Sequence, residues 1–203
     1  MSRLSRHLLR TLVPAAAAAL LPSLAFAHTG VGATHGFAHG FAHPLGGLDH
    51  LLAMLTVGLF AAQLGGRAIW AVPASFVALM AAGGALGVSG VDVPFVELGI
   101  GLSVAVLGAG VAFGLKAPLA VAMGMAGFFA IFHGHAHGTE MPLDASGLAY
   151  GLGFLSATAV LHLAGLGLGR TIGRFGETHG AKVVRGAGAA VAVAGLALVG
   201  GVL

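Results

Sequence analysis

The chain has 203 residues, of which 58% are apolar and only 7% are charged, and its mean hydropathy is +1.00. A soluble domain is about 45–50% apolar and about 25% charged, so this chain is too apolar to cover a globular surface with polar groups. The same composition excludes intrinsic disorder, and the lack of cysteine in the sequence excludes disulfides and thiolate metal sites. The sequence therefore indicates a membrane protein.

An N-terminal signal peptide is the first element that the sequence predicts. The apolar residues 12–24 end in Ala25-Phe26-Ala27 and follow three basic residues, Arg3, Arg6 and Arg10. This order is typical of a secretory signal peptide, and the apolar stretch is too short for the alternative, an uncleaved first span. Cleavage after residue 27 would leave six basic and six acidic side chains. The mature chain then has no basic patch with which to bind nucleic acid.

Six membrane-spanning helices are predicted for the rest of the chain. A span needs about 20 predominantly apolar residues, and the breaks between the apolar stretches carry residues typical of turns. The stretches are residues 44–64, 68–88, 95–115, 118–134, 147–168 and 183–203. We therefore expect an all-α, polytopic helix bundle. Its parts would be a cleaved signal peptide (1–27), a histidine-rich periplasmic segment (28–43) and a six-helix transmembrane domain (44–203).

The charges between the spans predict their direction. Signal cleavage would place the new N-terminus outside, and the loops that would then lie inside carry Arg67, Lys116, Arg170, Arg174 and Lys182. The outer loops would contain no Lys or Arg, only Asp92, Glu140 and Asp144. The signal peptide and the positive-inside rule therefore agree. We expect a multi-pass protein of the bacterial cytoplasmic membrane, with the mature N-terminus and the C-terminus in the periplasm.

Glycine pairs within the predicted spans indicate tight helix packing. The chain has 36 glycines, and small residues four positions apart let two helices approach closely in a membrane. The pairs with this spacing include Gly83/Gly87, Gly110/Gly114, Gly147/Gly151 and Gly165/Gly169. We interpret them as packing positions of a bundle with little room for a wide pore.

Two histidine clusters distinguish this sequence from an ordinary bundle. The first extends from His35 through a repeated His-Gly-Phe-Ala to Asp49-His50, and the second is Phe132-His-Gly-His-Ala-His-Gly-Thr-Glu140. In the predicted topology, the first cluster lies at the outer end of the first span and the second at the outer end of the fourth. Two groups of metal-ligand side chains that are distant in the sequence are therefore predicted to meet at one membrane face.

The spacing of the first cluster predicts one helical stripe. Pro44 suits the first position of a helix, so we expect the first span to begin there. His43 and His50 are seven residues apart and would lie on nearly the same helix face, with Met54 one turn further on. Asp49 and His50 would then lie about 8–9 Å below the start of the helix. Ionisable residues at that depth face the bundle interior or a wet cavity and indicate an ion path.

The second cluster predicts another stripe with the same chemistry. His133 and His137 form an i, i+4 pair, with Glu140 three residues further on if the helix extends that far. Neutral imidazole suits Ni, Cu, Zn and Fe, and carboxylates either orient it or bind the ion themselves, so the ligand types do not identify the metal. The predicted metal residues are His43, Asp49, His50, His133, His137 and Glu140.

Seven further residues are predicted less firmly to lie along a metal path: His28, His35, His39, Met54, Glu97, His135 and His162. The repeat around His35 and His39 is equally compatible with a low-complexity segment that only gathers cations. Glu97 near the outer end of the third span, and His162 deep in the fifth, are equally compatible with packed, hydrogen-bonded residues of a bundle.

Both clusters resemble the signatures of a known family. The pattern H-x5-D-H at His43, Asp49 and His50, and the pattern F-H-G-x-A-H-G-x-E from Phe132 to Glu140, are similar to the two signatures of the HupE/UreJ nickel permeases. This resemblance implies uptake of Ni²⁺ across the cytoplasmic membrane to supply hydrogenase or urease. It also assigns the essential positions to the six metal residues named above, and it leaves the roles of His135 and of the repeat open.

The partners that follow are a divalent metal ion and the lipid bilayer, without a prosthetic group and without nucleic acid; the oligomeric state is open. Two alternatives remain: transport of cobalt, zinc or copper, or a membrane protein that binds metal without moving it.

An enzyme is not expected. The string Gly87-Val88-Ser89-Gly90 is similar to a serine-protease motif, but Ser89 opens a loop and has no histidine partner of suitable geometry. The sequence also has no P-loop pattern for ATP-driven transport.

Overall fold

The computed structural model describes residues 36–141, 145–173 and 177–203, and within these ranges it contains helices and no strands. The helices are α2 (Phe37–Gly46), α3 (Leu48–Leu64), α4 (Ala68–Val88), α5 (Val96–Ala112), α6 (Leu119–Thr139), α7 (Ala145–Gly173) and α8 (Glu177–Val199). The expected all-α class is confirmed for this part of the chain. The predicted signal peptide, residues 1–27, lies outside the described residues.

Among the residues that the structure describes, four helices are long and apolar enough to cross a membrane: α4, α6, α7 and α8. The pair α2 and α3 passes the same test as one span bent by 88°, which makes five. The third predicted span corresponds to α5, which is apolar but has only 17 residues. The structure therefore supports a multi-pass membrane protein, and the count of six spans stays a prediction.

The start of the first span differs from the prediction. Pro44 does not begin a helix but lies inside α2, and α3 begins at Leu48 after Gly47, whose backbone is extended. Two consecutive glycines, at 46 and 47, disfavour a continuous helix here because glycine loses the most conformational freedom in one. The single helical stripe expected for His43 and His50 is therefore wrong, since the two residues belong to helices that meet at a sharp bend.

Close backbone contacts at glycines hold the helices in pairs. A Cβ atom at Gly83 or Gly134 would overlap the backbone of the partner helix in the α4–α6 pair, and one at Gly165 would overlap α3 from α7. The expected tight packing is confirmed at Gly83 and Gly165. It is wrong for Gly110 and Gly114: the first makes only ordinary contacts, and the second has a positive φ of 64° where α5 ends. α6 continues to Thr139, beyond residue 134, where the fourth span was expected to end, and Gly138 in this extension makes the same kind of contact with the backbone of Gly84.

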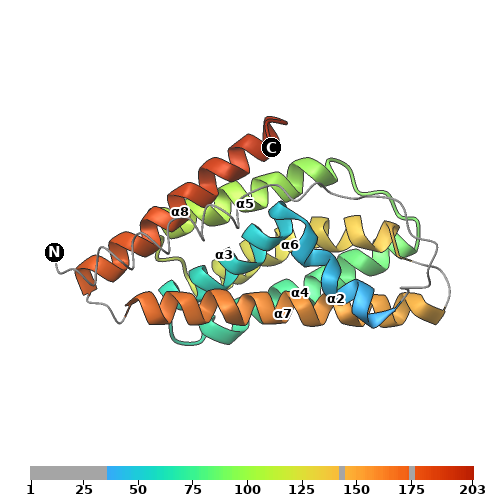
Figure 1. Cartoon of the computed structure of the whole chain (residues 1–203), viewed down its shortest axis with the longest axis horizontal. Helices are drawn as coiled ribbons and strands as arrows, with labels where there is room; N and C mark the ends of the chain where they lie inside the picture. The colour runs from blue at the N-terminus through green and yellow to red at the C-terminus, as the bar shows by residue number, and fades with distance from the viewer. Residues whose placement is uncertain (1–35, 142–144, 174–176) are drawn as a thin grey trace, which may run out of the picture. The chain divides into compact units, whose positions relative to one another are not determined.

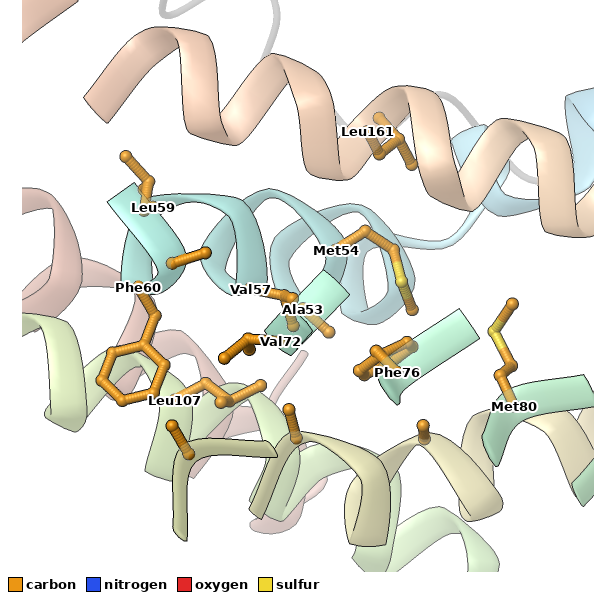
Figure 2. Close-up of a cluster of buried hydrophobic side chains, with 14 of the residues drawn as sticks. Ala53, Met54, Val57, Leu59, Phe60, Val72, Phe76, Met80, Leu107 and Leu161 are labelled. Carbon is orange, nitrogen blue, oxygen red and sulfur yellow. The ribbon is translucent and has the colours of Figure 1, made fainter. Parts of the chain in front are cut away.

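Figure 1 shows the paired arrangement, with α5 alongside α8 and α2 alongside the N-terminal part of α7. The buried core lies where α3, α4, α5, α6 and α7 meet, and Figure 2 shows part of it, including Met54, Phe76 and Leu161. Large apolar side chains also cover the outside: Trp70 is 60% exposed and Phe113 is 83% exposed. Apolar side chains that face away from the core in this number are expected where lipid surrounds the protein.

Candidate metal centre

The functional side chains gather at one end of the bundle. The first turn of α3 carries Asp49 and His50, and the last turns of α6 carry His133 and His137. These helices run in opposite directions, so the beginning of one lies beside the end of the other. The glycine contacts of α3 with α7 and of α6 with α4 fix both backbones.

His50 joins the two sequence clusters. Its Nε2 atom lies 2.9 Å from Nδ1 of His133 and 2.7 Å from Nε2 of His137. All three imidazoles are buried, and His133 is fully so. The two α6 histidines reach His50 together because they are four residues apart on one helix, as their spacing predicts. The prediction that the two clusters meet is confirmed.

Asp49 and Ser103 determine which ring nitrogens carry hydrogen. Oδ1 of Asp49 lies 3.2 Å from Nδ1 of His50, so the carboxylate accepts the hydrogen of that nitrogen. The Ser103 hydroxyl donates to the carbonyl of Ile100 at 2.6 Å, and its oxygen lies 2.7 Å from Nε2 of His133. Because the hydroxyl hydrogen is used, the Ser103 oxygen accepts the hydrogen of His133 Nε2.

Two lone pairs therefore face each other. In the neutral tautomers selected by Asp49 and Ser103, neither Nε2 of His50 nor Nδ1 of His133 carries a hydrogen. These two nitrogens are 2.9 Å apart and buried. Nε2 of His137, 2.7 Å from the same His50 nitrogen, can donate to His50, whereas a proton or a cation between His50 and His133 would pair both of their lone pairs. Histidine metal ligands commonly have their second nitrogen held by a carboxylate or another polar group in this way.

A second group of donors lies further out. His43 from α2, His137 and Glu140 offer ligand atoms that lie within 4.8 Å of one another, and Oε2 of Glu140 is 3.5 Å from a ring nitrogen of each histidine. A cavity of about 270 Å³ adjoins this group and is also lined by Asp49, His50 and Glu97. The cavity gives the outer group access to the buried histidines, since His137 belongs to both.

Aromatic rings enclose the histidines. Phe154 of α7 lies with its ring centroid 4.3 Å from that of His137 and 6.0 Å from that of His50. Tyr150 lies 5.8 Å from His43. No pattern in the sequence pointed to Phe154, Tyr150 or Ser103 as residues of this site. A lone hydroxyl in an apolar span and the single tyrosine of the chain were the available signals, but neither indicates a partner without the fold.

The other predicted residues lie at various distances from this centre. The ring of His39 is 6.0 Å from that of His43, Met54 is fully buried in the apolar core, and Glu97 lines the outer cavity. His135 donates from Nε2 to the carbonyl of Val91 at 2.8 Å and so contacts the loop after α4. His162 is buried on α7. His28 and His35 lie outside the described residues, and a metal role for any of these residues stays a prediction.

Comparison with known proteins agrees with this geometry. Residues 16–198 match the family described as HupE / UreJ protein. The chain is also 50% identical over 185 residues to Protein HupE of Rhizobium leguminosarum bv. viciae, which covers 91% of this chain and 95% of that protein. The chain belongs to the HupE/UreJ family. No solved structure matches it. Both histidine motifs lie within the matched range, so the centre described above is part of a HupE/UreJ protein, and the apolar helices agree with a multi-pass membrane protein.

Proposed function

We propose that this HupE/UreJ protein is a permease that moves a divalent transition metal, Ni²⁺, inward across the bacterial cytoplasmic membrane to supply hydrogenase or urease. The observation that carries the proposal is the contact of the two motifs at His50, which links an open outer cavity to the buried ring of His133. In this proposal a signal peptide is removed, both termini are periplasmic, and the outer group faces the periplasm.

The buried pair suits a transition metal. An imidazole nitrogen binds such a metal ion at about 2.0–2.1 Å. Two nitrogens that bind one ion with a right angle at the metal therefore lie about 2.9 Å apart, which is the separation of His50 Nε2 and His133 Nδ1. Right angles between ligands are typical of tetragonal Ni(II) and Cu(II) sites. The donors along the route are few at each step, so no step holds the ion too tightly for release.

The order of donors gives a route. The segment with His28, His35 and His39 would collect hydrated Ni²⁺, and the outer group of His43, His137 and Glu140 would receive it. The ion would then pass to His50 and His133. Glu140 and Asp49 supply negative charge beside the ion, and Asp49 also orients the ring of His50.

Uptake of radiolabelled nickel by proteoliposomes tests the proposal. We expect His50→Ala to lower the initial rate of uptake by about tenfold or more, because even residues that only orient a metal ligand change affinity by about 10–100-fold. His179→Ala is the matched control, since His179 is an exposed histidine outside both motifs. Equal uptake by both variants would refute the proposed route.

The same preparation separates the alternatives. Cobalt, zinc and copper as competitors would identify the preferred metal by the strongest inhibition of nickel uptake. A wild-type chain that binds nickel in detergent but moves none into liposomes would be a metal-binding protein instead of a permease.

A further inference from the structure

His162 on α7 is a buried imidazole that the proposed route does not use. Its side chain is 2% exposed, and neither ring nitrogen has a hydrogen-bond partner among the residues that the structure describes. A buried imidazole has one N–H donor and one acceptor nitrogen, and leaving both unpaired is unfavourable. Native structures keep such groups where another partner, such as an ion or water, satisfies them.

The backbone of His162 packs directly against α3. A Cβ atom at Gly58 of α3 would overlap the carbonyl of His162, so α3 and α7 are in close contact at this level. Gly58 lies eight residues after His50, about 12 Å further along the helix axis. The backbone of His162 is therefore well below the outer donors, in the middle of the apolar bundle.

One aromatic ring separates His162 from the metal centre. The ring centroid of Phe76 is 5.7 Å from that of His133 and 5.1 Å from that of His162, in an edge-to-face contact of 86° with the latter. Phe76 is fully buried. Figure 2 shows Phe76 in the same part of the core as Leu161, the residue before His162. The side chain of a helical residue leans toward the N-terminus of its helix, which for α7 is the end that carries the metal centre.

We propose that His162 is an inner metal-binding position, which receives the divalent cation from His133 once the ring of Phe76 has moved aside. The proposal rests on the proposed function, because it continues the same route. His162 suits the task because its ring is already desolvated and has both nitrogens free of hydrogen bonds within the described ranges. A single imidazole completed by water would hold the ion weakly, and weak binding is required of an inner position from which the ion leaves.

Two measurements test the inner position. In the first, His162→Ala should lower nickel uptake by proteoliposomes by about tenfold or more, while equilibrium binding of nickel to the purified protein at the outer donors stays unchanged. Retained binding shows that the variant is folded.

The second measurement uses the lack of cysteine in this chain. His162→Cys introduces the only thiol, and thiolate is a strong ligand for soft and borderline metals. We expect a thiolate-to-nickel charge-transfer band when Ni²⁺ is added to the purified variant. Leu161→Cys is the matched control, because Leu161 is the buried neighbour of His162 and packs in the apolar core. It should give no band.

The outcomes distinguish the inner position from the permease itself. Normal uptake by His162→Ala, or equal spectra for the two cysteine variants, would overturn the inner position and leave the proposed function intact. Loss of uptake without the band would show that His162 only supports the packing, which also overturns the proposal. A wild-type chain that moves no nickel would refute the permease, and the band in His162→Cys would still support binding at the inner position.

Discussion

Ser103→Ala tests whether the tautomer of His133 controls metal binding. The Ser103 oxygen is fully buried and accepts the hydrogen of His133 Nε2 at 2.7 Å. Alanine removes this acceptor and leaves a buried N–H without a partner, which costs about 1–3 kcal/mol of stability. It also frees the ring to place its hydrogen on Nδ1, the atom that faces His50.

The effect on affinity follows from the same geometry. Loss of a group that orients a metal-ligating histidine lowers metal affinity by about 10–100-fold, or about 1.4–2.7 kcal/mol. Equilibrium dialysis of the purified protein against radiolabelled nickel measures this change, and thermal unfolding without metal measures the change in stability. Both should fall in Ser103→Ala.

Ser75→Ala is the matched control for Ser103→Ala. Ser75 is also a serine within an apolar helix. Its hydroxyl donates to the carbonyl of Val72 at 2.8 Å, with the carbonyl of Met123 at 3.3 Å, and bonds to no imidazole among the described residues. Its replacement should leave nickel affinity unchanged. Equal dissociation constants for the two variants would refute the argument that Ser103 acts through His133.

Two further predictions concern packing and the loop after α4. Gly134→Val should abolish accumulation of folded protein in the membrane, because its Cβ would overlap the backbone of Met80. Gly124→Ala on the same helix should accumulate normally, because its Cβ would meet no atom of the described residues within 4 Å. Immunoblots of membranes compare the two variants. His135→Ala should lower the free energy of unfolding by about 0.5–1.5 kcal/mol, because it loses the bond to the Val91 carbonyl, and should leave nickel affinity unchanged. A large loss of affinity would show that His135 binds the ion.

Much of the helical arrangement is present in the local sequence. The second predicted span, residues 68–88, has the same bounds as α4, because an apolar run bounded by Gly-Gly-Arg and Ser-Gly gives an unambiguous start and end. The pair His133 and His137 also follows from the sequence, since an i, i+4 spacing places two side chains on one face of any regular helix. The signal peptide and the direction in the membrane remain predictions.

The first span could not be predicted from local signals. Pro44 is a good first residue of a helix, but the contact of Gly40 with the backbone of Tyr150 on α7 stabilises a separate helix, α2, which begins at Phe37 and contains Pro44. The spacing of seven residues between His43 and His50 therefore led to the wrong prediction that both side chains lie on one face of a single helix. The bend at Gly47 brings His43 to Glu140 from a different helix.

Composition and two short motifs determined that this chain is a membrane protein with metal-ligand side chains at two separate places, since both properties depend on residue type and local spacing. Only the tertiary structure decided that His50 contacts both His133 and His137 and that Ser103 fixes a tautomer. It also decided that His162 is buried with no hydrogen-bond partner in the described part of the chain. These facts depend on which helices pack together, and helix pairing depends on glycine contacts between residues far apart in the sequence.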